Sequence, residues 1–240
     1  MTFPTRLHQY FDITLPLSEI VIKIRPFKHY ERLVLLTAIT SKDINTINNA
    51  IKDLLSNCIK NDVNINNFNT LDIEYIVLKL YSISVNNVID IEHICPMCQH
   101  KTKLKINIDN DIKFIKNNVD NIIKFDDTLG VVMQELSYLN HKKSLEIEDE
   151  LIQNKFIVKH HIKSVFTGTE NYEMKDLDNF NNLDNLLESL TDADFNKIYK
   201  YIENPSVLKY QYKFNCKSEE CKEIGHMNEI ILQGLNDFLA

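Results

Sequence analysis

The sequence has few glycines, no tryptophan and no long apolar run, and these shortages narrow the range of functions. Four glycines in 240 residues leave no glycine-rich loop of the kind that cradles phosphate groups. Thr167-Gly168-Thr169 is better interpreted as a turn. Because no stretch of 18 apolar residues occurs, we expect no membrane span. No apolar signal segment follows Met1, which weighs against an extracellular, disulfide-bonded protein.

The charge of the chain does not indicate a basic nucleic-acid-binding protein. The formal net charge is −7, and 44% of the residues are hydrophobic, enough for the chain to bury a core and fold on its own. Basic residues do gather at residues 100–105 and 159–163. We interpret these two runs as solvated faces.

The sequence contains two close pairs of cysteines. Cys95 and Cys98 are separated by two residues, and Cys216 and Cys221 by four. A structural zinc ion takes four thiolates in a tetrahedron, and ligands two to four residues apart can converge from one turn. Each pair interrupts a predicted strand–turn–strand, because apolar residues alternate on both sides of it. The pattern therefore predicts one structural zinc ion held by Cys95, Cys98, Cys216 and Cys221, in a zinc ribbon whose two halves are far apart in the chain.

Other interpretations of the cysteines stay open at this stage. The four thiols can also form disulfides or stay free, and the wider gap makes the second pair the weaker half of the motif. His93, His100 and His226 are near enough to replace a thiolate. If protein atoms fill all four positions, the ion has no open site for catalysis, which argues against a zinc hydrolase. The fifth cysteine, Cys58, lies among apolar residues and is expected to be buried.

The fold class predicted from the pattern is α+β and mainly helical. Residues 1–87 are expected to form a β-hairpin (11–15 and 20–24) followed by three helices. The helices are predicted from 28 to 39, from 43 to 55, and from Thr70 onward, with Asp72 and Glu74 favoured in the first turn of the third by the helix dipole. Residues 88–110 and 206–240 would form the split zinc ribbon with a C-terminal helix over 234–239.

The segment between the cysteine pairs, residues 111–205, is predicted to be a helical insertion. Apolar spacing indicates helices over 129–139, 144–165 and 183–190. Thr191 and Asp194 resemble a capping box that begins a further helix ending before Pro205. The Asn-rich runs 64–69 and 179–182 are predicted to be loops, because asparagine competes for backbone hydrogen bonds.

We find no arrangement of residues that predicts an enzyme, and we name no catalytic residue. Glu146, Glu148, Asp149 and Glu150 are acidic, but adjacent residues on a helix point in different directions, so a solvated face is favoured over an acid–base pair. His160 and His161 diverge by about 100° on a helix and are poorly placed to share a metal. No small-molecule substrate is expected.

A zinc-ribbon module that binds nucleic acid or acts in transcription is the alternative function. Lys101, Lys103 and Lys105 alternate along one predicted strand and would line one face. The second hairpin adds Glu219, Glu220, Glu223 and Glu229, so the combined surface is nearly balanced. We therefore favour protein partners over nucleic acid.

Several short motifs, taken in order, resemble the baseplate hub subunit family of T4-like contractile-tailed phages. The motifs in the second half are Leu190-Thr-Asp-x-x-Phe195-x-x-Ile198, Pro205, an aromatic strand that leads into the cysteines, and Leu232-Gln-Gly234-Leu235-Asn-Asp237-Phe238. The motifs in the first half are Phe27-x-x-x-Glu31, Phe68-x-x-Leu71-Asp72-Ile73-Glu74-Tyr75-Ile76, Ser84-Val85-Asn-Asn-Val88 and Cys95-x-x-Cys98. The chain departs from the family pattern at the second cysteine pair, where a two-residue gap would be expected.

The resemblance implies a role in phage tail morphogenesis. The chain would be either a subunit of the baseplate hub or a chaperone that acts while the hub assembles. Its partners would be other hub or tail proteins, without nucleic acid or membrane. It would be located in the host cytoplasm during assembly and, as a hub subunit, in the tail baseplate of the virion.

Overall fold

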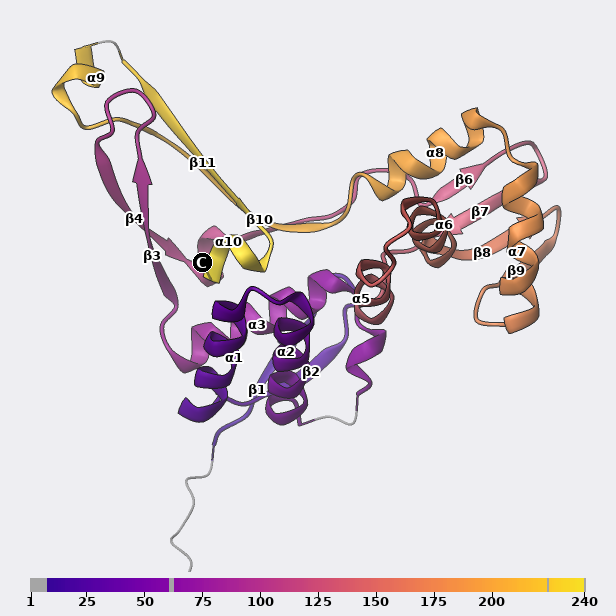
Figure 1. Ribbon diagram of the computed structural model, residues 1–240, viewed down its shortest axis with the longest axis horizontal. Helices are drawn as coiled ribbons and strands as arrows, with labels where there is room; N and C mark the ends of the chain where they lie inside the picture. Colours follow the sequence, from indigo (N-terminus) through magenta and orange to yellow (C-terminus); the bar gives the residue numbers. More distant parts are fainter. Residues whose placement is uncertain (1–7, 61–62, 224, 240) are drawn as a thin grey trace, which may run out of the picture. The chain divides into compact units, whose positions relative to one another are not determined.

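The computed structural model describes residues 8–60, 63–223 and 225–239 (Figure 1). The chain divides into two compact units, which we describe separately. The main unit comprises residues 1–65, 71–115 and 207–240, and the insertion unit comprises residues 66–70 and 116–206. The division into 1–87, 88–110 with 206–240, and 111–205 stays a prediction.

The main unit begins with a hairpin and three helices. Strands β1 (Phe11–Thr14) and β2 (Val21–Ile24) pair antiparallel, and helices α1 (His29–Ser41), α2 (Ile44–Cys58) and α3 (Thr70–Ser84) follow, with the short 3₁₀ helix η1 (Ile65–Asn67) before α3. The carboxylate of Asp43 caps α2 by accepting the Thr46 N–H, which satisfies a donor that the helix leaves unpaired. Within the described residues, we find no helix with both the length and the apolar character that a bilayer span requires.

Asp72 has a different role from the one its position in the sequence indicates. It lies in the first turn of α3 but is fully buried. Its two carboxylate oxygens accept the backbone N–H groups of Leu17 and Ser18 at 3.0 and 3.1 Å. Asp72 therefore fixes the turn of the N-terminal hairpin against α3.

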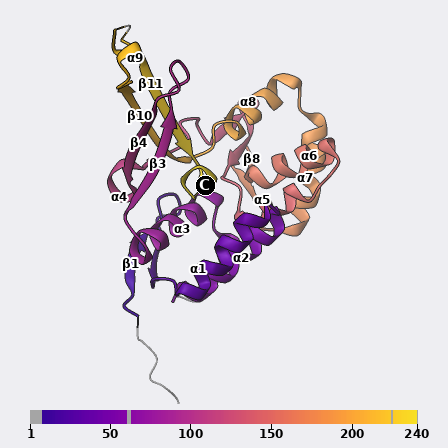
Figure 2. The same cartoon turned by 60° about the vertical axis from the view of Figure 1, so that its left-hand side comes forward.

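The rest of the main unit is an arm built from two hairpins, which we call the cysteine arm. The first hairpin is β3 (Val88–Ile94) with β4 (Lys101–Asn107), and the second is β10 (Val207–Asn215) with β11 (Met227–Gln233). The two hairpins lie side by side in both views (Figures 1 and 2). Their inner apolar side chains, with Leu71 and Leu78 of α3 and Phe238 of α10 (Leu235–Leu239), form one core at the base of the arm.

Three short elements complete the main unit. Helix α4 (Ile108–Asp111) follows β4, and helix α9 (Glu219–Glu223) follows Cys216 and contains Cys221. Strand β5 (Lys113–Ile115) pairs antiparallel with the beginning of β10, so that Ile115 lies opposite Val207.

The insertion unit combines a sheet with four helices. The sheet is antiparallel, with the order β6 (Ile122–Lys124), β7 (Leu129–Met133), β8 (Ile162–Thr167), β9 (Glu170–Glu173). The helices are α5 (Tyr138–Leu145), α6 (Glu150–His161), α7 (Leu177–Ser189) and α8 (Asp192–Ile202). Its buried core draws on the sheet, α6, α7 and α8, through Ile123, Val131, Met133, Val158, Ile162, Leu183, Leu187, Ile198 and Tyr201.

The prediction of a helical insertion is wrong, because this unit contains a four-stranded sheet. The predicted helix over 129–139 is instead strand β7 followed by the start of α5. Gly130 accounts for part of the difference: a Cβ there would lie 2.4 Å from the Phe166 ring and 2.5 Å from the Ile123 carbonyl oxygen, so glycine permits close packing with both neighbouring strands. The segment 144–165, predicted as one helix, instead contains the end of α5, all of α6 and the start of β8.

The predicted fold class, a mainly helical chain with a split zinc ribbon and a helical insertion, is corrected by the strand content. Helices take 44% and strands 28% of the described residues, and the strands form four small sheets. The two cysteine hairpins belong to separate sheets, one of two strands and one of three. They meet through side chains.

Candidate metal centre

The first cysteine loop is a tight turn between β3 and β4. The Cys95 N–H donates to the His100 carbonyl at 2.9 Å, and the Gln99 N–H donates to the Cys95 carbonyl at 2.9 Å. Gln99 adopts a left-handed conformation with φ of 59°, which turns the chain back toward β4. The loop therefore holds the Cys95 and Cys98 thiols on one side.

The second cysteine loop also brings its two cysteines together, although four residues separate them. The Cys216 N–H donates to the His226 carbonyl at 3.1 Å, and the His226 N–H donates to the Cys221 carbonyl at 3.0 Å. Helix α9 lies within this loop and carries Cys221. Gly225, with φ of +63°, supplies the left-handed residue before β11. The four-residue spacing is thus accommodated by a short helix that brings Cys221 back toward Cys216.

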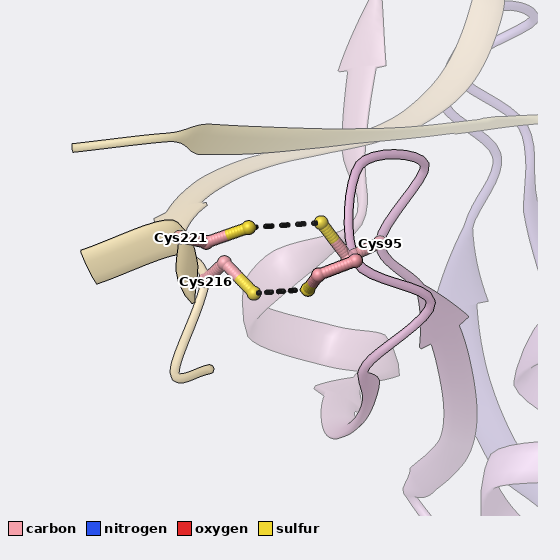
Figure 3. Close-up of side chains that lie close together, drawn as sticks. Cys95, Cys216 and Cys221 are labelled. Carbon is pink, nitrogen blue, oxygen red and sulfur yellow. Dashed lines mark hydrogen bonds between the residues drawn. The ribbon is translucent and has the colours of Figure 1, made fainter. Parts of the chain in front are cut away.

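The two loops bring all four thiols together (Figure 3). The Sγ atoms of Cys95 and Cys221 are 4.0 Å apart, those of Cys98 and Cys216 are 3.6 Å apart, and all four lie within 4.8 Å of one another. Four sulfurs at the usual Zn–S distance in a tetrahedron are about 3.8 Å apart. The separations of 3.6 and 4.0 Å both exceed the length of a disulfide bond, and all five cysteines are free.

The thiols are buried and perturb one another. Cys95, Cys216 and Cys221 are at most 2% exposed. Burial acts to raise the pKa of Cys95, but hydrogen bonds from the Cys98 and Met97 amides and the neighbouring thiols outweigh it and lower that pKa to about 6. Burial and the neighbouring thiols raise the pKa of Cys221. Backbone amides aimed at the first loop therefore favour a thiolate there.

This donor set fits a soft tetrahedral metal ion. Four thiolates are the ligands of structural zinc sites, and the protein would supply every coordination position. Among the described residues, the group that can hold a metal contains these four cysteines and no histidine. The structure thus brings together every predicted ligand, although the metal itself is not identified.

A polar layer lies in the arm next to the cysteines, and the sequence did not indicate it. His93 is paired with Thr102 across β3 and β4, and its ring packs edge-on against Phe214, which lies opposite Asn228. Thr102 and Asn228 are 6% and 3% exposed. Their side-chain polar atoms and the Nε2 of His93 have no hydrogen-bond partner among the described residues. The only sequence signal was a polar residue at an inward position of three of the four strands.

The other candidate residues have structural explanations. His160 and His161 each place Nδ1 2.8 Å from the carbonyl four residues earlier in α6, and burial lowers both pKa values. Asp149 caps α6 through the Ile152 N–H. Cys58 is fully buried, and burial raises its pKa to about 12, so its thiol stays protonated.

The lysines of the first hairpin are balanced by acids on the neighbouring strand. Lys103 lies opposite Glu92 and Lys105 lies opposite Asp90, while Lys101 forms a 2.8 Å ion pair with Glu92. The second hairpin has a similar pair between Lys213 and Glu229 at 3.5 Å. A face with alternating charges lacks the continuous positive potential that binds phosphates.

Comparison with known proteins places the chain in a family. No curated protein and no solved structure matches it. A family model described as "T4 bacteriophage base plate protein" matches residues 8–240, nearly the whole chain. This match confirms the resemblance noted in the sequence, and it includes both cysteine loops and the insertion. The protein belongs to the T4 bacteriophage base plate protein family.

Proposed function

We propose that this baseplate protein acts in the hub of the phage tail, as a hub subunit or as a chaperone of hub assembly. It acts by binding other hub or tail proteins and catalyses no reaction. It is synthesised in the host cytoplasm and, as a subunit, remains in the baseplate of the virion. The observation that carries the proposal is the family match over residues 8–240.

We further propose that Cys95, Cys98, Cys216 and Cys221 hold one structural zinc ion per chain. The sulfur separations of 3.6 and 4.0 Å support this, since they bracket the tetrahedral value. The ion would join hairpins that are remote in sequence and would contribute on the order of several kcal/mol to folding. An arm whose two loops are joined in this way is rigid, and a rigid arm suits a protein that acts by binding partners through its surface.

The nucleic-acid alternative has less support. The acids opposite Lys103 and Lys105 neutralise the surface that would meet phosphates. Retention on DNA that weakens steeply as salt rises would favour that alternative, because phosphate contacts release counterions.

The zinc proposal is tested by the metal content of the purified chain. Elemental mass spectrometry of protein prepared in reducing buffer should give about one zinc per chain. Cys95→Ser and Cys216→Ser should each lose it, because each removes one ligand from a different loop. Cys58→Ala is the matched control: it removes a buried cysteine outside the cluster and should keep the metal. Parent protein without zinc would refute the proposed site.

The assembly role is tested separately in infected cells. A tagged chain should co-purify with hub intermediates. Its presence in finished tails would identify a subunit, and its loss before completion would identify a chaperone. Recovery of the chain alone from a lysate that contains hub proteins would contradict both roles.

A further inference from the structure

Helix α1 has an apolar face that none of the described residues of its unit covers. Tyr30, Leu33, Val34 and Leu36 are 74%, 47%, 37% and 43% exposed, whereas Leu35 and Ala38 on the opposite side are buried. Residues three and four apart lie on one face of a helix, so Tyr30, Leu33, Val34 and Thr37 form a stripe. A helix with apolar residues all round is typically buried on all sides.

The threonines of this face add to its apolar character. The hydroxyl of Thr37 donates to the Leu33 carbonyl and that of Thr40 to the Leu36 carbonyl, both at 2.8 Å. Each hydroxyl is therefore bonded to its own helix. The outward face of α1, from Tyr30 to Thr40, bears no charged residue.

A groove continues this face toward the arm. It has a volume of about 400 Å³, and its lining includes Leu36 and Ile39 of α1, Tyr81 and Val85 near the end of α3, and Phe238 of α10. Leu36 belongs to both surfaces, so the α1 face and the groove form one apolar surface within the main unit.

The charges beside this surface are mostly positive. Lys28 and Lys42 are exposed near the two ends of α1, and Arg32 lies on the groove wall together with one acid, Asp90. The Glu31 carboxylate pairs with the buried Arg25 at 2.7 Å and also accepts the Lys28 N–H at 2.7 Å. Among the described residues, the ion pairs formed include none of Lys28, Arg32 or Lys42.

We propose that the α1 face and its groove bind an amphipathic helix of another tail protein, with carboxylates flanking its apolar stripe. The apolar stripe would cover Tyr30, Leu33 and Leu36, and the carboxylates would meet Lys28, Arg32 and Lys42. A second copy of the chain is disfavoured, because antiparallel pairing would place Lys28 of one copy near Lys42 of the other. The partner's identity as a tail protein rests on the proposed function.

The test is photo-crosslinking in infected cells. Tyr30 is replaced by p-benzoylphenylalanine, and the crosslinked peptide is sequenced by mass spectrometry. Leu151, an apolar residue in α6 that is 81% exposed, receives the same replacement as the control. We expect Tyr30 to capture a peptide of a different tail protein, apolar at helical spacing and bearing Asp or Glu, at least tenfold more than Leu151 does.

Variants give an independent measure of the same surface. Leu33→Asp with Leu36→Asp should reduce recovery of the chain with tail complexes at least tenfold, while zinc content and thermal unfolding stay unchanged. Lys28→Glu with Lys42→Glu should reduce it several-fold, and Leu151→Asp should have no effect. Crosslinks to a second copy, to the same chain or to a basic peptide would overturn the proposal, as would equal capture at Leu151. If the chain still co-purifies with hub proteins in that case, the docking surface is wrong and the proposed function stands.

Discussion

The tip of the cysteine arm and the core of the insertion unit are held together in different ways. In the insertion unit, nine buried residues from strands and helices form the core. At the tip of the arm, the buried cluster consists of cysteines alone, and the adjacent layer contains His93, Thr102 and Asn228. Burial of apolar surface can stabilise the insertion unit, whereas the tip has little apolar surface to bury. The difference indicates that the tip depends on a cross-link between its loops.

The largest effect we predict is the loss of order at the tip when a ligand or the metal is removed. Chelation, or Cys216→Ser, should destabilise the arm by several kcal/mol, because the four thiols are the main connection there. Methyl NMR would report on Ile91 of the arm and Ile123 of the insertion during urea unfolding. We expect the unfolding midpoint reported by Ile91 to move to a much lower urea concentration and the midpoint reported by Ile123 to stay unchanged. Equal shifts of both signals would show that the cross-link is not local.

The complementary prediction concerns the core of the insertion unit. Ile198 is fully buried in α8, so Ile198→Ala should cost about 2–5 kcal/mol through lost burial and a residual cavity. Urea unfolding followed at Ile123 should show this loss, with the zinc content and the Ile91 signal unchanged. Val21→Ala, at an exposed position, is a control that should change little. Loss of zinc in Ile198→Ala would mean that the two regions are coupled.

Acid should weaken the insertion unit through its buried histidines. Burial lowers the pKa of His141, His160 and His161 below the ordinary 6.5, so the unfolded state binds more protons. The free energy of unfolding is therefore constant well above pH 6.5 and falls as the pH decreases through that value, by up to about 1.4 kcal/mol per pH unit for one histidine.

Urea unfolding at several pH values, followed at Ile123, measures this slope. His161→Leu should reduce it, because His161 is the most buried of the three. His29→Gln, which changes an exposed histidine in α1, should leave it as it is. A slope unaffected by His161→Leu would assign the acid sensitivity to other groups.

The smallest predicted effect concerns the polar layer of the arm. The Thr102 hydroxyl is buried without a partner among the described residues, so Thr102→Val should stabilise the arm by up to about 1 kcal/mol. The reverse exchange in the insertion core, Val131→Thr, should destabilise by about 1–3 kcal/mol. Unfolding followed at Ile91 measures the effect of Thr102→Val in the arm, and unfolding followed at Ile123 measures the effect of Val131→Thr in the insertion unit. Destabilisation by Thr102→Val would show that the hydroxyl has a bonding role in the arm.

The convergence of the four cysteines could be predicted because it depends on metal chemistry and local spacing. The pairs 95/98 and 216/221 each form a loop that follows a strand, and a shared ion is the simplest use of two such loops. The polar layer could not be predicted in the same way. His93 meets Phe214, the residue opposite Asn228, only through the packing of two remote hairpins, which no local pattern encodes.

The insertion was harder to predict, because its elements are short and tertiary contacts override local preference. Strand β6 has three residues, too few for a period to be visible. The Asn-rich segment 179–182 lies in α7, not in a loop. Asp176 begins that helix by accepting the N–H groups of Asp178 and Asn179, and burial of Leu183 and Leu187 outweighs the weak helix propensity of asparagine.

The pairing of Ile115 with Val207 has a consequence for how such a chain can change over generations. The segment between these residues leaves and rejoins the main unit at two neighbouring positions of one sheet. A gene can therefore lengthen, shorten or exchange that segment in one recombination event without altering the strand register on either side. Such a junction allows changes to accumulate in that segment while the cysteine arm is inherited intact.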